Sequence, residues 1–385
     1  MKVVISSVTT KIGGGVTTIS HLTQELSSLD RNIRYIVFVN RNIYNMIDKH
    51  ISKRNLVYMT TNYNKIPFLN RLWFEQFILA RMHNKEYLCV LISFNNICCF
   101  FWPGHQIVLI QSIAPFLKEA QDGKGFYNRV RYFILNLLTR LSFRYADIVI
   151  VNSKFSASLV LHKGCPKERI RIIPLGLNKI FLDKSKLLTA ACQHRDGYIL
   201  TVGNLYRHKN FEVLIKSVAE LLHRGYNWPF YIVGSPIDFR YYEHLKALAD
   251  SMKVSNLVKF IGPVDYDDLP SFYTKASAFV LVSKAENFPY PLIEAMACGC
   301  PIIASRQIPT EEICGEAALL CDAYDPIDVA NKIEKVMTDN NLYKKMQMVG
   351  LKRVKRYNWH DIAKQYYEII MSLIDSGNKS PKIKQ

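Results

Sequence analysis

The 385-residue sequence lacks the features that mark membrane and secreted proteins. No stretch approaches the roughly 20 uninterrupted apolar residues of a membrane-spanning helix. Met1 leads directly into the apolar run Val3 to Ile5, without the separate charged and long apolar regions of a signal peptide. We therefore expect a cytoplasmic protein without a signal peptide.

The nine cysteines also lack the spacing of a disulfide framework or a zinc site. Cys98-Cys99 and Cys298/Cys300 are the only close pairs, and neither has the two-plus-two spacing of zinc ligands. An odd count without framework spacing favours reduced thiols that serve as small core residues in a reducing compartment. We expect no metal site.

Acidic residues are few relative to basic ones, with 32 against 50, which gives a net charge of +18. Such an excess favours nucleic acid, an anionic membrane surface or phosphorylated substrates as partners. Because the basic residues are dispersed and no RNA or DNA motif is legible, nucleic acid is disfavoured. The length and the 49% hydrophobic content suit two domains with sizeable cores.

Short apolar runs alternate with helical patterns along the chain, which predicts an α/β protein with doubly wound parallel sheets. In the first half the expected strands are Lys2–Ser7, Arg34–Val39, Tyr87–Ser93, Gln106–Ile110, Asp147–Val151 and Arg169–Pro174. In the second half they are Tyr198–Val202, Phe230–Val233, Val258–Ile261, Ala278–Val282 and Pro301–Ala304. Residues 179–195 are polar and weakly patterned, which predicts a hinge, and 377–385 predict a disordered basic tail.

The stretch 277–305 is the most informative part of the sequence. After the strand that begins at Ala278 comes a loop, and Pro291 suits the first position of a short helix. Gly299 stands where a left-handed residue ends a helix, before the next strand. The unit is therefore strand, loop, helix, strand.

Two glutamates stand at the ligand-binding end of this unit. Glu286 lies in the loop beyond the carboxyl end of a parallel strand, and Glu294 lies one turn inside the helix on the same side. The N–H groups at the helix start can hold a phosphate. Two carboxylates and an anion-binding helix end suit a phosphorylated sugar. The alternative is a solvated loop glutamate and a helix-surface glutamate.

Two more loops have the composition of phosphate sites. Lys11–Gly15 separates the first strand from a helix over Val16–Leu26, so its backbone N–H groups can approach a phosphate or sugar, although a tight turn without a ligand is equally compatible. In the second half, Gly203 is followed by Arg207 and Lys209 ahead of a helix. Two cations there suit a diphosphate, and a solvated basic loop is the alternative.

Glu286 and Glu294, with PLIEAMACGCPII around them, resemble the E-x7-E motif of family 4 glycosyltransferases, which have the GT-B fold. The resemblance covers nearly the whole chain, but only the second half is motif-specific. Lys209 falls on a lysine of the family's Gly-(x5)-Lys segment. The loop departs from the family, because most members have Gly-Phe-Gly where this chain has Asn287-Phe288-Pro289.

Two further positions depart from the family pattern. Many members have arginine after the glycine of the Gly-(x5)-Lys segment, where this chain has Asn204. The resemblance then implies that Arg207 would supply the second positive charge. Many members also place a histidine after the strand Gln106–Ile110, where this chain has Gln111 or Ser112. His105 precedes that strand and is interpreted as a surface loop residue without a catalytic role.

The resemblance implies two facing Rossmann-like domains, and a C-terminal helix that crosses back to the first. Residues 1–178 with the helix 359–376 would bind the acceptor, and 179–358 would bind the donor. The donor-side residues it implies are Gly13, Gly14, Gly15, Gly203, Asn204, Arg207, Lys209, Gly262, Glu286, Asn287, Phe288, Pro289, Leu292 and Glu294, and the acceptor-side residues are Gln111 and Ser112.

The implied reaction is retaining transfer of a hexosyl-type sugar from a nucleotide diphosphate sugar, most simply a UDP- or GDP-sugar, without a cofactor or metal. Lys209 and Arg207 would neutralise the leaving diphosphate, Glu286 would bind the donor sugar and Glu294 the ribose. The acceptor would be a glycan or lipid-linked oligosaccharide of bacterial surface polysaccharide synthesis, handled at the membrane's cytoplasmic face. The alternatives are a nucleotide-sugar epimerase, a sugar phosphorylase, an inactive relative or a nucleic-acid-binding protein.

Two remaining segments allow a choice of interpretation. In Tyr127–Arg144, apolar and basic residues interleave at helical spacing, which fits a core-facing helix with arginines in water or a helix apposed to an anionic membrane. Asp265–Asp268 contains a D-x-D sequence, but it precedes an amphipathic helix. We expect its aspartates to cap N–H groups rather than bind a metal.

Overall fold

The computed structural model describes residues 1–8, 14–47, 53–61, 72–81, 89–94, 96–117, 121, 126–183 and 197–377. The chain divides into two compact units, of which unit 1 comprises residues 1–116, 125–176 and 357–385, and unit 2 comprises 117–124 and 177–356. Each is described separately below. Three predicted features lie outside the described residues: the loop Lys11–Gly13, most of the hinge (184–195) and the tail from 378.

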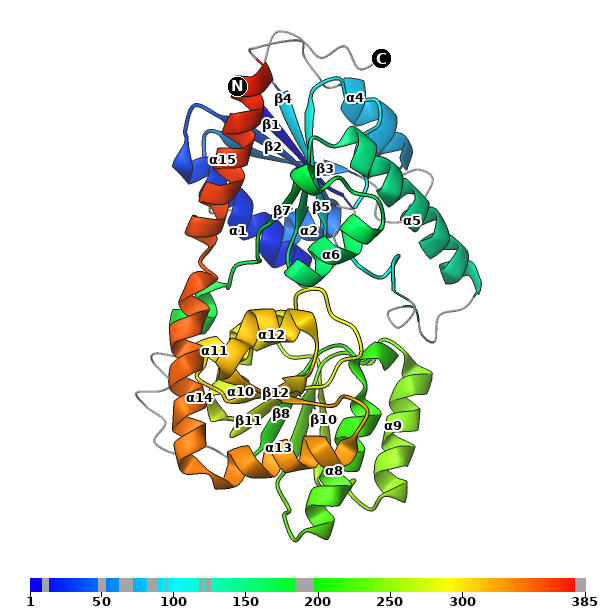
Figure 1. Ribbon diagram of the computed structural model, residues 1–385, viewed down its shortest axis with the longest axis vertical. Coiled ribbons are helices and arrows are strands. Elements are labelled where there is room, and N and C mark those ends of the chain that lie inside the picture. Colours follow the sequence, from blue (N-terminus) through cyan, green and yellow to red (C-terminus); the bar gives the residue numbers. More distant parts are fainter. Residues whose placement is uncertain are drawn as a thin grey trace. The chain divides into compact units, whose positions relative to one another are not determined.

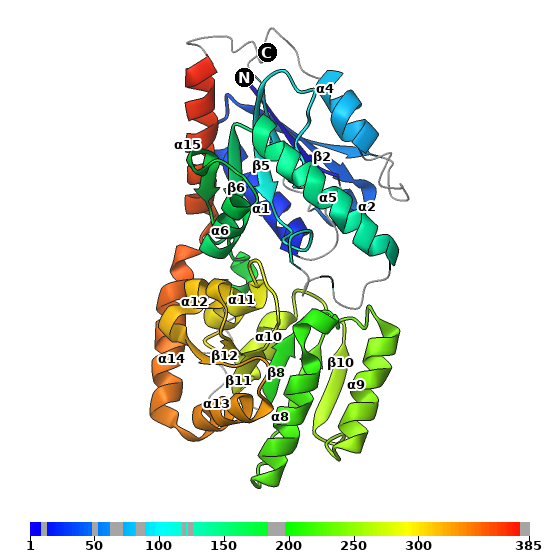
Figure 2. The same cartoon turned by 45° about the vertical axis from the view of Figure 1, so that its right-hand side comes forward.

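Within its described residues, unit 1 is built on a seven-stranded parallel sheet of order β3-β2-β1-β4-β5-β6-β7 (Figures 1 and 2). Its strands are β1 (Lys2–Ser7), β2 (Arg34–Asn40), β3 (Leu56–Thr61), β4 (Cys89–Ser93), β5 (His105–Ile110), β6 (Ile148–Val151) and β7 (Ile170–Ile172). Its helices are α1 (Gly14–Leu29), α2 (Arg41–Met46), a helix over 72–81 made of η1 (Phe74–Ile78) and α4 (Leu79–Arg81), α5 (Phe126–Tyr145), α6 (Lys154–His162), η3 (Lys167–Arg169) and α15 (Trp359–Gly377).

Helices cover both faces of this sheet. Because successive side chains of a strand point to opposite faces, Val3 and Ile5 pack with α1 and α15, whereas Val4 packs with η1 and α4 on the other side. Buried residues of β5 and β6 form a further cluster with α5 and α6. Strands buried on both faces explain the nearly continuous apolar runs of the sequence.

Helix α15, the last one among the described residues, belongs to unit 1. Trp359, at the start of α15, stacks on His21 of α1 with ring centroids 5.9 Å apart. Gly176 lies against the same indole, so closely that a Cβ on Gly176 would stand 2.4 Å from Trp359 Cδ2. The close approach explains why glycine occupies this position.

Unit 2 has a six-stranded parallel sheet of order β10-β9-β8-β11-β12-β13 within its described residues. Its strands are β8 (Ile199–Val202), β9 (Phe230–Val233), β10 (Val258–Gly262), β11 (Ala278–Leu281), β12 (Ile302–Ser305) and β13 (Ala318–Cys321). Its helices are η4 (Arg207–Lys209), α8 (Phe211–His223), α9 (Phe239–Ser251), α10 (Leu269–Lys275), α11 (Tyr290–Ala297), α12 (Ile308–Cys314), η5 (Gly315–Ala317), α13 (Pro326–Thr338), α14 (Asn340–Arg353) and η6 (Val354–Arg356). α8, α9 and α13 share one core with the sheet, and α10 meets the other face where Tyr273 contacts Phe279.

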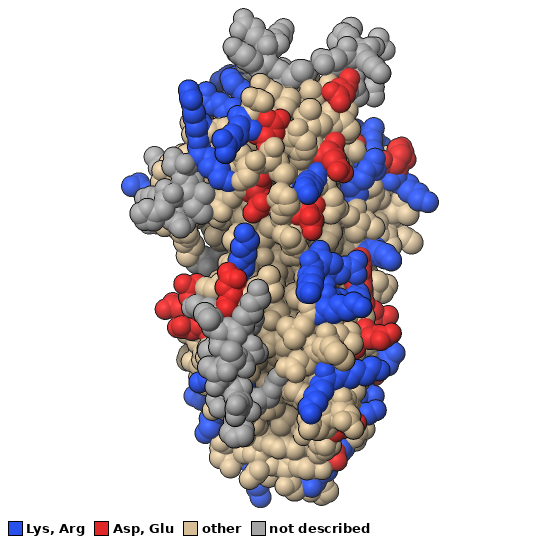
Figure 3. All heavy atoms as spheres, turned by 90° about the vertical axis from the view of Figure 1, so that its left-hand side faces the viewer, with Lys and Arg blue, Asp and Glu red and all other residues tan. Residues whose placement is uncertain are grey.

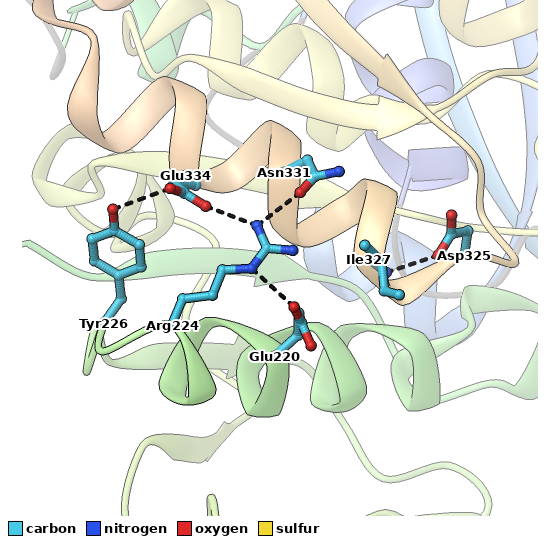
Figure 4. A network of polar contacts seen from close by, with 7 residues as sticks. All are labelled: Glu220, Arg224, Tyr226, Asp325, Ile327, Asn331 and Glu334. Carbon is cyan, nitrogen blue, oxygen red and sulfur yellow. Dashed lines mark hydrogen bonds and ion pairs between the residues drawn. The ribbon is translucent and has the colours of Figure 1, made fainter.

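A polar network joins α8 to α13 on the surface of unit 2 (Figure 4). The guanidinium of Arg224 donates to Glu220 at 2.9 Å and to Glu334 at 2.8 Å. Hydrogen bonds from Arg224 and Tyr226, followed by the charge of Arg224, lower the pKa of Glu334. Asp325 caps the start of α13 by accepting from Ile327 N, so this helix is held at its start and along its length.

The basic excess is not gathered in one stripe on the face that Figure 3 shows, where lysine and arginine form several separate groups with acidic side chains between them. Among the described helices, none is both long enough and apolar enough to cross a membrane. The seven cysteines whose side chains the structure describes are buried thiols that take part in no disulfide, and their burial fits the expectation of small core residues.

Most predicted strands and the unit 277–305 are confirmed to within two residues, including the left-handed Gly299 at φ +62°. Three local expectations are wrong. Neither β3 nor β13 was predicted: two residues of β3 are exposed, and β13 has only four residues, of which the two leucines are half-buried. Asp268 occupies the N-cap position of α10, but its side chain makes no capping bond to the described N–H groups. His105 is the first residue of β5 rather than part of a loop, and its Nδ1 lies 3.4 Å from Asp147 Oδ2.

We predict that Gly176→Ala destabilises unit 1. The new methyl group would displace the Trp359 indole from α1, so unfolding free energy should fall by about 1–3 kcal/mol. Gly350→Ala is the matched control, because its Cβ would meet the Met296 side chain at an ordinary 3.4 Å inside helix α14. Thermal unfolding monitored by circular dichroism measures both. Equal midpoints for Gly176→Ala and the wild type would contradict the packing argument.

Candidate active site

The candidate site of unit 2 lies where the order of its strands reverses. The sheet runs β10-β9-β8 in one direction from this point and β11-β12-β13 in the other. Open parallel sheets bind ligands beyond the carboxyl ends of the strands at such a reversal. Lys209 follows β8 and Glu286 follows β11, so the two predicted side chains come from the two strands that flank it.

Lys209 and Glu286 form a nearly buried ion pair. Lys209 Nζ lies 2.5 Å from Glu286 Oε1, and the two side chains are 15% and 13% exposed. Burial by itself raises the pKa of the Glu286 carboxyl, but the positive charge of Lys209 and smaller effects of its neighbours hold that pKa below its usual value. Glu286 is therefore a carboxylate at neutral pH, placed within contact of a cation.

Asn210 fixes the loop that carries Lys209, and sequence reasoning missed it. Its backbone is left-handed, at φ +62°, and its buried amide donates to Val282 O at 3.3 Å and to Ala323 O at 2.5 Å. Lys284 N also donates to His208 O at 2.7 Å. These hydrogen bonds join the loops after β8, β11 and β13. One signal in the sequence indicates this role, an asparagine directly before a helix, because asparagine adopts the left-handed conformation more readily than most residues.

Glycines end three neighbouring strands at this edge. A Cβ on Gly234, after β9, would stand 2.1 Å from Gly203 O, after β8, so the two loops are in backbone contact. Gly234 N donates to Gly262 O, at the end of β10, at 2.9 Å. The predicted residues Gly203 and Gly262 thus belong to one connected edge, and the stem of Lys209 passes within 4 Å of the Cβ position of Gly203.

The other two predicted residues of the β8 loop face different partners. Arg207 Nε lies 3.7 Å from Asp238 Oδ2, and its guanidinium lies over the ring of Tyr241 at 5.1 Å. Asn204 Oδ1 accepts from Ser235 N at 3.2 Å. Arg207 is thus held by the segment after β9, whereas Lys209 is held by Glu286.

The helix that follows Glu286 begins as the sequence predicted. α11 starts at Tyr290, with Pro289 as the N-cap residue and a proline in its first turn. Phe288 and Pro289 are buried, Asn287 is half-buried, and Leu292 is fully buried. Leu292 therefore supports the loop from the core and offers its side chain to no ligand.

Glu294 has its own hydrogen-bond network. Its carboxylate accepts from Tyr273 OH at 2.9 Å and from Tyr266 OH at 3.1 Å, and the residue is 4% exposed. Phe181 packs against both tyrosine rings. The two glutamates of the predicted motif therefore lie in separate networks, one with a cation and one with two hydroxyl groups.

The same burial acts on both glutamates, but the outcome differs. Burial raises the pKa of Glu294 to about 7, because two hydroxyl donors offset only part of the desolvation penalty. Around neutral pH this carboxyl is present in both protonation states. It can donate as well as accept a hydrogen bond, which Glu286 cannot.

A family model, Glycosyl transferases group 1, matches residues 191–353. The match contains Lys209, Glu286 and Glu294. Residues 191–353 are a glycosyl transferases group 1 domain.

Curated relatives agree with this domain. A D-inositol 3-phosphate glycosyltransferase of Corynebacterium jeikeium is 29% identical over 251 residues, 62% of this chain and 60% of that protein. O-antigen chain mannosyltransferase B of Escherichia coli is 26% identical over 247 residues, 62% of this chain and 63% of that protein. The chain thus matches less than two thirds of the length of these relatives.

Solved structures extend the likeness to the whole fold. A sucrose-phosphate synthase from Thermosynechococcus elongatus has a TM-score of 0.77 at 19% identity, covering 97% of this chain and 99% of that one. HepE from Anabaena, solved with UDP and glucose, has a TM-score of 0.72 at 17% identity, covering 97% and 100%. Two Rossmann-like units, the second of which contains the group 1 match, constitute the GT-B fold.

The predicted residues of unit 1 lie outside the group 1 domain, at the carboxyl edge of their own sheet. Gln111 and Ser112 follow β5, and the side chain of Asn96 accepts from the backbone N–H groups of both at 3.0 and 3.2 Å. Gly14 and Gly15 begin α1, and Gly13 lies outside the described residues. Asn96, left-handed at φ +63°, is a second asparagine that sequence reasoning missed.

A concavity of about 870 Å³ in unit 1 lies at the opposite edge of that sheet. It is lined by Ser27, Ser28, Arg31, Asn32, Arg34, Lys53, Arg54 and Asn55. These residues surround the amino ends of β2 and β3, whereas parallel sheets bind substrates at their carboxyl ends. The concavity is therefore no candidate for the site of the group 1 domain.

We predict that Glu294→Gln removes a pH dependence of stability. The folded pKa of about 7 lies above the ordinary 4.5, so the folded state binds the proton more tightly. The wild type should lose stability relative to the variant as pH rises from 4.5 through 7, by up to about 3 kcal/mol. Thermal unfolding across this range measures the difference. Glu243→Gln, on an exposed part of α9, is the control, and parallel pH curves for wild type and Glu294→Gln would contradict the assignment.

Proposed function

We propose that the chain is a retaining glycosyltransferase that moves a hexosyl-type sugar from a nucleotide diphosphate sugar to a glycan or lipid-linked oligosaccharide. The observation that carries the proposal is the ion pair Lys209–Glu286 at the strand reversal inside a group 1 glycosyl transferase domain. A cation and a carboxylate in contact can serve the two halves of such a donor, its diphosphate and its sugar.

Lys209 stabilises the leaving diphosphate in this mechanism. An ammonium group has three N–H donors, and the Glu286 contact at 2.5 Å uses one of them. Lys209 can therefore keep its carboxylate partner while it donates to a phosphate oxygen. Since negative charge on the diphosphate grows as the glycosidic bond breaks, a fixed cation there lowers the barrier more than it tightens donor binding.

Glu286 accepts hydrogen bonds from hydroxyls of the donor sugar and stabilises the positive charge that develops on the sugar. Glu294 accepts from the ribose. A carboxylate has about four lone-pair positions, and the tyrosines use two of them, so acceptor capacity remains. The start of α11 adds N–H groups and the positive end of a helix dipole for the phosphates. Arg207, held beside Asp238, contributes positive potential rather than a direct contact.

The acceptor belongs to bacterial surface polysaccharide synthesis, at the cytoplasmic face of the membrane. Support comes from the net charge of +18 and from the likeness to an O-antigen chain mannosyltransferase. The donor is a UDP- or GDP-sugar, and the fold likeness to a structure solved with UDP supports UDP first. The loop Asn287-Phe288-Pro289 borders Glu286 and is where donor preference would be set.

Two substitutions separate the roles of the ion pair. Lys209→Met should abolish the rise in melting temperature that a matching nucleotide sugar gives, because the cation for the diphosphate is lost. Glu286→Gln should keep the rise caused by the free nucleoside diphosphate and lower sugar transfer or donor hydrolysis by about a hundredfold. The measurements are thermal shift with UDP-, GDP- and dTDP-sugars and release of nucleoside diphosphate.

The matched control is Lys332→Met, which removes the lysine of a half-buried pair with Asp328 on α13, away from the candidate site. It should leave both measurements unchanged. Near-wild-type turnover of Glu286→Gln would refute its catalytic role, and conversion of the donor into its epimer without any acceptor would favour an epimerase.

We also predict activity without divalent metal, because Lys209 and the helix start take the role that a metal plays elsewhere. Transfer measured with excess EDTA should match transfer measured with added Mg²⁺ or Mn²⁺. Loss of activity in EDTA that Mn²⁺ restores would contradict the assignment of Lys209.

A further inference from the structure

Unit 1 carries an exposed apolar stripe along α5. Residues 130, 133, 134, 137 and 141 recur at helical spacing and therefore share one side of the helix. All five are exposed, with Phe133 at 73% and Leu137 at 59%. The opposite side packs into the unit through Leu135, Thr139 and Phe143, which are buried. α5 thus has two apolar faces: one is packed against the rest of unit 1, and the stripe is the other.

An aromatic cluster lies on the helix over 72–81 and the loop after β4. Trp73 and Phe77 stand one turn apart with ring centroids at 4.5 Å, and Phe77 meets Phe101 at 5.2 Å. Trp73 is 59% exposed and Phe101 is 60% exposed. A cluster of large aromatic rings that remains exposed to solvent is typical of an interaction surface.

The stripe and the cluster lie on neighbouring elements of unit 1. Cys98 N, in the loop that carries Phe101, donates to Ser142 Oγ of α5 at 3.0 Å. Phe100 contacts the ring of Tyr145, also on α5, at 5.2 Å. α4 and α5 lie beside each other on the same side of unit 1 in both ribbon views (Figures 1 and 2). We call the combined surface the α5 face.

The charge of the α5 face selects its partner. α5 has four arginines and no acidic residue. Arg129 and Arg140 are exposed and, eleven residues apart, lie along the same edge of the stripe, and Arg144 lies eleven residues after Phe133, on the stripe itself. An apolar strip bordered by arginines, with tryptophan and phenylalanine beside it, has the composition of a surface that sits at an anionic lipid–water interface.

We propose that the α5 face is the membrane-docking surface of the protein, and that its partner is a bilayer rich in anionic lipids. Phe133, Leu137 and the aromatic cluster enter the headgroup–acyl boundary, and the arginines hold lipid phosphates. The site on unit 1 is inferred from this unit alone; its purpose, delivery of the enzyme to a lipid-linked acceptor, rests on the proposed function.

Vesicle flotation of the full-length chain tests the proposal. The wild type should float with phosphatidylcholine vesicles that contain phosphatidylglycerol, and more weakly with phosphatidylcholine alone or at high salt. Phe133→Ser with Leu137→Ser should weaken binding at least about tenfold, since two exposed anchors are removed. Arg140→Gln with Arg144→Gln should weaken it about tenfold on the anionic vesicles only.

The control is Met348→Ser with Leu351→Ser on α14, a basic helix of unit 2 where these residues are 67% and 40% exposed. It should bind like the wild type. A second readout locates the contact: vesicles should shift the tryptophan emission of the wild type to the blue, and Trp73→Phe should remove most of the shift. Circular dichroism melting of each variant checks its folding.

Equal flotation of the wild type and Phe133→Ser with Leu137→Ser would overturn the proposal. So would a wild type that binds neither vesicle but self-associates through these residues, since the α5 face would then join two copies of the chain. Vesicle binding without any nucleotide-sugar response would leave the docking surface standing and refute the proposed reaction, so the two failures are distinguishable.

Discussion

The candidate site of unit 2 depends on one contact, the ion pair between Lys209 and Glu286. Each partner alone would be an uncompensated charge in a nearly buried place, which costs several kcal/mol. The contact requires two loops, from strands on either side of the reversal in sheet order, to bring their side chains to 2.5 Å. The neighbouring hydrogen bonds and close backbone contacts keep these two loops in place.

The residues that support the ion pair adopt backbone conformations that are unfavourable for most residues. Asn210 adopts a left-handed backbone that costs an ordinary residue about 1–2 kcal/mol. Its two buried amide hydrogen bonds, to Val282 O and Ala323 O, offset that cost and join three loops of the sheet edge. Gly234 acts in the complementary way, because the absence of a side chain lets its loop touch the backbone of Gly203. Strained or side-chain-free positions thus cluster where the edge must be rigid.

Local structure was predictable from the sequence, whereas contacts between residues far apart in the chain were not. The strand–loop–helix–strand unit at 277–305 follows from apolar periodicity, a helix-starting proline and a helix-ending glycine, all local signals. The partners of Glu294 come from Tyr266 and Tyr273, and the partner of Arg207 from Asp238, which no spacing indicates. The meeting of Lys209 with Glu286 lies between these cases, because strand order implies a shared edge but no distance.

The two buried glutamates show why that long-range information matters for chemistry. Burial disfavours the charged form of both, yet a cation beside Glu286 reverses the effect, whereas hydroxyl donors beside Glu294 leave its pKa raised to about 7. Environments that separate the pKa values of two carboxyls assign them different tasks. Glu286 is committed to acceptor chemistry at any physiological pH. The protonation of Glu294 can change near neutral pH, because its pKa is about 7. A ligand hydroxyl that donated to this carboxyl would favour its ionised form and so oppose the effect of burial.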